Sequence, residues 1–150
     1  MQTIVIRHRK ENLKKCSLRG LESREDMQFI SYPFESLPPL NNYLMLVVEG
    51  APPLTIADKD RELLFLDSTW RYLPKMVKAV EASYLVEKRV LPGSFLTAYP
   101  RAQEDCINPA KGLSTVEALY IAYRILGRDT KGLLDHYHWR DSFIKLNRFC

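Results

Sequence analysis

Leu63-Leu64-Phe65-Leu66-Asp67-Ser68-Thr69-Trp70 is the stretch on which the predicted fold of this chain depends. Four consecutive large apolar residues indicate a strand buried on both faces, as interior strands of parallel sheets are. The run ends in polar residues, and in open α/β sheets ligands bind just beyond the carboxyl ends of the strands. Asp67 and Trp70 therefore stand where a small-molecule site is expected. A second interpretation is that Asp67 or Ser68 caps the next helix, with Trp70 packed beneath it.

The remaining apolar patterns predict an α/β architecture. Further strands are expected at residues 3–6, 27–30, 43–48 and 95–98, with a short helical turn at 55–58. Helices are expected at 71–82, at 114–126 and at about 130–147, and the second begins with a capping box of Ser114 and Glu117. Because strands alternate with helices, we expect a mainly parallel sheet flanked by helices.

Length and composition predict one soluble globular domain over residues 1–150. The chain is 46% hydrophobic and 27% charged, and no apolar run approaches the roughly 20 residues that span a bilayer. Residues 1–6 lack a basic region followed by an apolar one, so no secretory signal and a cytoplasmic location are expected. The three cysteines have no CxxC spacing, which predicts free thiols and no metal site.

Positive charge is concentrated near the amino terminus. Seven basic residues, opposed there by Glu11 and Glu22, lie close together: Arg7, Arg9, Lys10, Lys14, Lys15, Arg19 and Arg24. Such clustering favours a polyanionic partner, nucleic acid being the usual candidate. The alternative is a solvated basic loop.

Several catalytic motifs are missing from the sequence. It contains no GxGxxG or P-loop pattern and no GxSxG elbow, which argues against dinucleotide binding, nucleotide hydrolysis and serine hydrolases. What remains are polar residues at breaks after apolar segments, including Ser17, Gly50 and Asp67. The residues alone predict a ligand pocket formed by loops after strands.

Ordered motifs make the chain resemble the DTW-domain superfamily. They are Leu66-Asp67-Ser68-Thr69-Trp70, then Leu91-Pro92, then Leu113-Ser114-Thr115-Val116-Glu117-Ala118. Members of this superfamily transfer a 3-amino-3-carboxypropyl group from S-adenosylmethionine to uridine-type bases in RNA. Lys14-Lys15-Cys16-Ser17 resembles the KKCT-type motif of the small-subunit rRNA branch, and Tyr137-His138-Trp139-Arg140-Asp141-Ser142-Phe143-Ile144-Lys145-Leu146-Asn147 resembles its FxWGxxFLxLN signature.

The resemblance implies a SPOUT-like, knotted fold and an RNA-modifying aminocarboxypropyltransferase of ribosome biogenesis, with rRNA favoured over tRNA and a monomer expected. It implies that Asp67 is the catalytic residue and S-adenosylmethionine the cofactor. Cofactor contacts carry over to Ser17, Val48, Gly50, Leu66, Trp70, Leu91, Tyr99 and Ser114. RNA contacts are expected from Arg7, Arg9, Lys10, Lys14 and Lys15.

The chemistry of such a transfer gives these residue types a physical purpose. A bulky apolar wall, Trp70 with Leu73, would bury the methyl group and hold the γ-carbon in line with a base nitrogen. Asp67 would accept the proton that leaves this nitrogen, or would hold substrate or cofactor by hydrogen bonding. Two other functions remain open: an RNA methyltransferase of SPOUT type, and a non-catalytic RNA-binding or ribosome-assembly protein.

Overall fold

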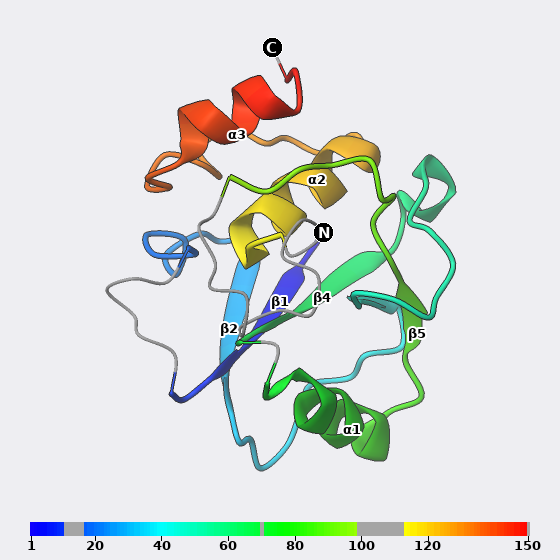
Figure 1. Cartoon of the computed structure of the whole chain (residues 1–150). Helices are drawn as coiled ribbons and strands as arrows, with labels where there is room; N and C mark the ends of the chain where they lie inside the picture. The colour runs from blue at the N-terminus through cyan, green and yellow to red at the C-terminus, as the bar shows by residue number, and fades with distance from the viewer. Residues whose placement is uncertain (11–16, 70, 99–112, 150) are drawn as a thin grey trace.

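One parallel five-stranded sheet forms the centre of the molecule (Figure 1). The computed structural model describes residues 1–10, 17–69, 71–98 and 113–149. The strands lie in the order β2-β1-β4-β3-β5, and every pair of neighbours is parallel. Their bounds are β1 Thr3–His8, β2 Met27–Tyr32, β3 Tyr43–Leu46, β4 Glu62–Asp67 and β5 Glu87–Arg89.

Helices cover both faces of this sheet. α1 (Leu73–Ser83) lies on one side, whereas α2 (Thr115–Ile125) and α3 (Arg140–Leu146) lie on the other (Figure 1). A 3-10 turn, Ile56–Asp58, precedes β4 and is capped by Thr55. The predicted α/β architecture with a mainly parallel sheet is therefore confirmed.

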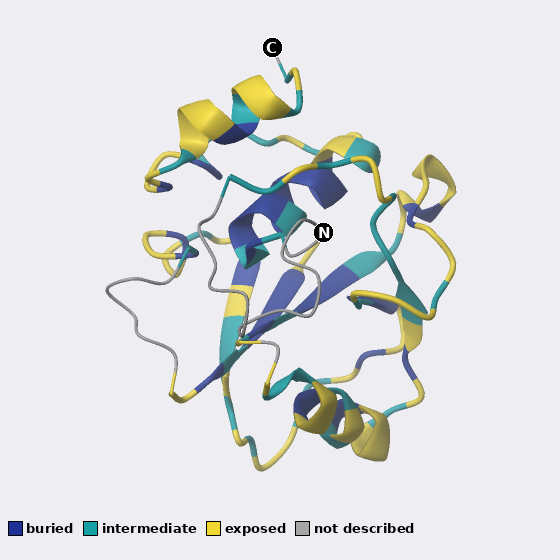
Figure 2. Ribbon diagram, in the orientation of Figure 1, coloured by how far each residue is buried: buried dark blue, intermediate teal, exposed yellow. Residues whose placement is uncertain are grey.

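Alternating side chains of the central strands supply two separate hydrophobic cores. Val5, Leu63 and Phe65 belong to the core beneath α2, while Ile4 and Leu64 belong to the core beneath α1. This alternation follows from the two-residue repeat of a strand, whose successive side chains point to opposite faces. Figure 2 shows the result, with the central strands and the inner side of α2 buried. The apolar run at 63–66 is thus explained by burial on both faces.

Two sequence predictions about local structure are wrong. Residues 95–98 form no strand, because their backbone bonds to side chains: Leu96 N–H donates to Asn147 and Ala98 N–H to Glu117. The helix predicted over 130–147 is reduced to α3, and residues 131–136 form turns that include Gly132 at φ +84°.

The sequence also missed one strand. β5 consists of three charged residues and lies at an edge of the sheet, where strands do not need an apolar pattern.

The connections that follow β1 and β4 leave the sheet on opposite faces. The segment after β1 packs Leu18 and Leu21 into the core beneath α2, whereas α1, which follows β4, packs Met76 and Val80 into the other core. Strands whose connections diverge in this way define a topological switch point, and ligands of open α/β sheets bind in the crevice there. A ligand site is therefore expected at the carboxyl ends of β1 and β4.

The two-sided burial of β4 predicts a strong effect of a cavity in that strand. Leu64→Ala should lower the free energy of unfolding by about 2–5 kcal/mol, because Leu64 is fully buried and its removal leaves a void. Leu85→Ala is the matched control, since Leu85 is fully exposed, and it should change stability by less than about 0.5 kcal/mol. Urea unfolding curves measure both, and equal effects would contradict the two-core arrangement.

Candidate functional site

A buried ion pair joins β1 to β4 at the switch point. Arg7 and Asp67 are register partners at the carboxyl ends of the two strands. Arg7 Nε donates to Asp67 Oδ2 at 3.3 Å, and the two side chains are only 11% and 5% exposed. Arg7 also forms an ion pair with Glu22 at 3.2 Å and lies over the ring of Phe29. Asp67 is therefore held at the predicted place, the end of the central buried strand.

The amino terminus of α2 meets this ion pair. Thr115, the first residue of α2, donates its hydroxyl to Asp67 Oδ1 at 2.8 Å. One residue further on, Val116 N–H donates to Ser17 Oγ at 3.3 Å. Asp67, Ser17 and the start of α2 thus come together, although they are far apart in the sequence. We call Arg7, Ser17, Asp67, Ser68 and Thr115 the edge cluster.

Ser68 gives the edge cluster an unused hydrogen-bonding group. Its Oγ is buried and has no hydrogen-bond partner among the residues that the structure describes. Buried polar atoms are nearly always bonded, so an orphaned hydroxyl on the residue that follows Asp67 fits a polar ligand at this edge. The cluster can therefore offer hydroxyl groups and a carboxylate to a small polar molecule.

The structure describes five of the other predicted cofactor residues. Ser114 is buried, and its side chain forms the predicted capping box with Glu117. Val48 and Gly50 are exposed after β3, where Gly50 takes φ +81°. Leu66 is partly buried against the core beneath α1, and Leu91 is partly buried against the core beneath α2. The predicted cofactor residues Trp70 and Tyr99, and the predicted RNA-binding residues Lys14 and Lys15, lie outside the described residues.

The predicted RNA-binding residues do not all reach the surface. Arg9 and Lys10 are exposed, but Arg7 is mostly covered and is bonded to Asp67 and Glu22. The reason is the strand alternation, which turns Arg7 toward Phe29 and α2. Arg7 therefore belongs to the edge cluster and is not part of an exposed basic surface.

Glu117 is a fully buried carboxylate that fixes the segment at 97–98 beside the core beneath α2. It accepts from Thr97 Oγ1 at 2.6 Å, Ala98 N–H and Ser114 N–H at 2.8 Å, and Tyr137 Oη at 2.9 Å. Four donors use the full accepting capacity of a carboxylate. Glu117 therefore positions residues 97–98 and the start of α2, and the capping-box interpretation of Ser114 and Glu117 is confirmed.

His8 ends β1 on the face opposite to Arg7. It stacks on Tyr72 with ring centroids 4.2 Å apart, and its Nδ1 accepts from Lys10 N–H at 3.1 Å. Burial lowers the pKa of His8 below its usual range, and the positive charges of Lys10 and Arg9 lower it further. His8 is therefore a neutral ring at neutral pH.

Sequence reasoning did not name Thr115, Ser68 or His8 as site residues, although Ser68 and Thr115 lie within the motifs that carry the resemblance. Thr115 could have been found as the first residue after a capping serine, but only the tertiary structure brings its hydroxyl to Asp67. Within the described residues, no group of three or more His, Cys, Asp or Glu side chains is arranged to hold a metal ion. No helix of this part of the chain has the length and apolar character that a bilayer span requires.

A parallel α/β domain with polar side chains at its switch point is the class of protein that these features define. No protein-family model and no curated protein matches the chain. The chain is similar in structure to the SAM-dependent rRNA:acp-transferase Tsr3 from Vulcanisaeta distributa, with a TM-score of 0.71. The match covers 98% of this chain and 79% of that one at 22% sequence identity, so it establishes the fold.

The edge cluster predicts that Asp67 matters for folding as well as for any chemistry. Asp67→Asn should destabilise the protein by about 1.5–3 kcal/mol, because it removes the more buried of the two carboxylates that pair with the Arg7 guanidinium and leaves the more exposed Glu22. Asp135→Asn is the matched control, because its ion pair with Arg140 is exposed, and it should cost at most about 1 kcal/mol. Equal unfolding free energies in denaturant would show that the Arg7–Asp67 pair is unimportant.

The neutral state of His8 predicts a pH dependence of stability. The folded protein binds fewer protons at His8 than the unfolded chain does, so stability is complete above the unfolded pKa of 6.5 and falls as the pH drops below it. His8→Phe keeps a stacking ring and removes this titration. The variant should show a flatter loss of stability between neutral and mildly acidic pH, measured by thermal unfolding. A loss as steep as in the wild type would refute the assignment to His8.

Proposed function

We propose that this protein transfers a 3-amino-3-carboxypropyl group from S-adenosylmethionine to a uridine-type base in RNA, with rRNA as the favoured target. The observation that carries the proposal is the edge cluster, which gathers polar side chains at the switch point of the sheet. Support also comes from the similarity in fold to a SAM-dependent rRNA:acp-transferase. A SPOUT-like, knotted path of the chain belongs to the same proposal.

The residues at this edge fit S-adenosylmethionine in chemical character. Ser17 and the orphaned Ser68 hydroxyl would bind its polar groups, and Asp67 would attract its positive charge. Val48 and Gly50 follow the neighbouring strand β3 and would line the same edge. When bound, S-adenosylmethionine supplies an electrophilic γ-carbon next to its sulfonium.

We assign to Asp67 a holding role in the reaction. Its two oxygens accept hydrogen bonds from Arg7 and Thr115, so the carboxylate is already oriented before any ligand arrives. A carboxylate that is fixed in this way suits the orientation of a positively charged ligand, because both of its oxygens are already held in direction. Asp67 would thus bind and orient the cofactor.

Labelled S-adenosylmethionine tests the reaction directly. With carboxyl-labelled cofactor and a cell's own rRNA and tRNA, label should move into RNA, whereas methyl-labelled cofactor should leave RNA unlabelled. Transfer of the methyl label would instead identify a methyltransferase. If calorimetry detects no binding of S-adenosylmethionine, the result favours a non-catalytic RNA-binding or ribosome-assembly protein over both enzymes. Mass spectrometry of nucleosides from cells that lack the protein identifies the modified base.

Single hydroxyl deletions test the location of the cofactor. Ser17→Ala and Ser68→Ala should each weaken binding of S-adenosylmethionine by about 2-fold to 10-fold, the value of one hydrogen bond. Ser36→Ala is the control, because Ser36 is exposed in the loop between β2 and β3 and should leave affinity unchanged. Thermal unfolding of each variant separates a loss of affinity from a loss of fold. Unchanged affinity in both edge variants would place the cofactor elsewhere.

A further inference from the structure

Aromatic contacts join the end of β1 to the start of α1. His8 stacks on Tyr72, the residue that precedes α1, and its ring is also 5.3 Å from that of Tyr32. Lys10 Nζ lies 5.6 Å from the centre of the Tyr72 ring on the same side of the molecule. These contacts bring Lys10, which follows β1, next to the start of α1.

Exposed basic residues gather around the start of α1. Lys75 and Lys78 lie three residues apart in α1, which places them on one side of the helix, Arg71 lies two residues before the helix begins, and all three are exposed. No acidic residue occurs between positions 68 and 80. Among the described residues none of the three takes part in an ion pair, whereas the acidic Glu81 further along α1 is paired with Lys88.

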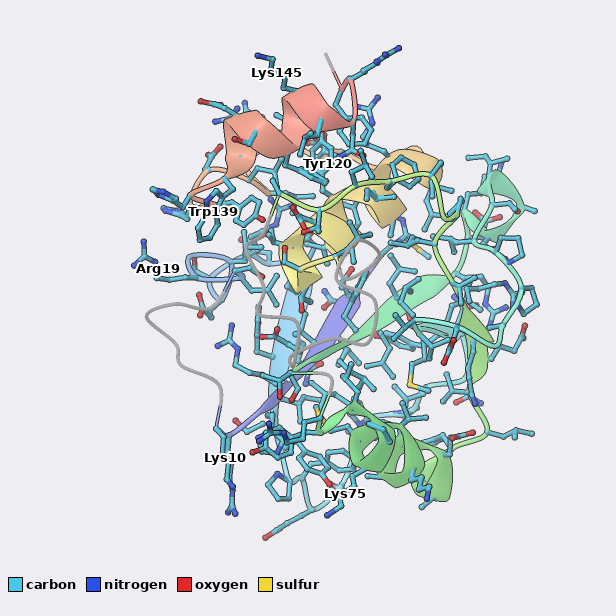
Figure 3. All side chains as sticks on the ribbon, viewed as in Figure 1. Lys10, Arg19, Lys75, Tyr120, Trp139 and Lys145 are labelled. Carbon is cyan, nitrogen blue, oxygen red and sulfur yellow. The ribbon has the colours of Figure 1, made fainter. Side chains whose placement is uncertain are left out.

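Together these side chains form one surface, which we call the basic surface. Its members are Arg9, Lys10, Arg71, Lys75 and Lys78. Figure 3 shows Lys10 and Lys75 at the same end of the molecule, with Lys145 of α3 at the opposite end. Because Arg71 stands four residues after Asp67 and Lys10 three residues after Arg7, the basic surface begins at the carboxyl edge that holds the edge cluster.

We propose that the basic surface binds the phosphate backbone of the RNA substrate and delivers the target base to the edge cluster. The proposal rests on the proposed function and deepens it by assigning the face on which RNA lies. Phosphate binding needs exposed, unpaired cations, and each phosphate contact releases a condensed counterion. A positive surface that adjoins the reactive site also concentrates a polyanion where it is needed.

Other kinds of partner fit the basic surface less well. Protein interfaces are depleted in lysine, yet Lys10, Lys75 and Lys78 make up most of this surface. A helix that lies on a membrane presents its apolar side to lipid, but Met76 and Val80 of α1 are buried against the sheet. RNA therefore remains as the partner that the exposed side chains match.

A pair of charge-matched variants tests the basic surface. Lys75→Ala/Lys78→Ala removes two of its lysines, and Lys131→Ala/Lys145→Ala removes two exposed lysines outside it. All four sites are exposed, so neither variant should lose its fold. Binding of a short fluorescein-labelled single-stranded RNA is measured by anisotropy over a series of KCl concentrations, and binding of S-adenosylmethionine is measured by calorimetry.

The Lys75/Lys78 variant should bind this RNA about tenfold more weakly than the wild type, with a salt slope smaller by about 1.4, since each phosphate contact on a single strand contributes about 0.7. The Lys131/Lys145 variant should match the wild type, and S-adenosylmethionine should bind all three proteins equally. Equal loss of RNA affinity in the two variants overturns the proposal.

Lysine-dependent binding to phosphatidylserine vesicles or to polyglutamate, without binding to RNA, also overturns it. If the wild type transfers no label to RNA but the Lys75/Lys78 variant still shows the specific loss of RNA affinity, the basic surface stands and the proposed reaction fails. If transfer occurs but RNA affinity does not depend on Lys75 and Lys78, the reaction stands and the basic surface fails.

Discussion

The mostly buried contact between Arg7 and Asp67 is the interaction on which the arrangement of this molecule depends. It couples the carboxyl ends of two adjacent strands and, through Thr115, ties them to the start of α2. A charge pair withdrawn from water is stable only when its hydrogen bonds are made, so these three residues constrain each other. Any ligand that binds at this edge meets a surface whose polar groups are already oriented, which reduces the cost of ordering them on binding.

A second buried carboxylate, that of Glu117, holds separate segments together in the core beneath α2. Glu117 accepts hydrogen bonds from four donors in three separate segments. The side-chain amide of Asn147 bonds to both the backbone N–H and the backbone carbonyl of Leu96. Backbone groups that would be paired in a strand are satisfied here by side chains. The segment at 95–98 is consequently held in place without regular secondary structure, and it connects α3 to the amino-terminal end of α2.

Much of this structure could be predicted from short-range patterns. The apolar run at 63–66 predicted a strand buried on both faces, and the Ser114–Glu117 spacing predicted the start of α2, because both signals lie within a few residues. Longer-range effects could not be predicted in this way. The apolar residues at 133–134 suggested a helix although they lie in turns. Arg7 was predicted to be a surface cation, and only the structure showed that its strand position buries it.

The sequence by itself determined the parallel α/β class, the place of Asp67 at the end of a buried strand and the concentration of basic residues near the amino terminus. Only the tertiary structure decided which of these cations are exposed and which are paired. It also placed Lys10 beside Tyr72, at the start of a helix that carries exposed lysines. The physical reason is that hydrophobic periodicity is a local property, whereas the pairing of charges depends on which strands and helices become neighbours.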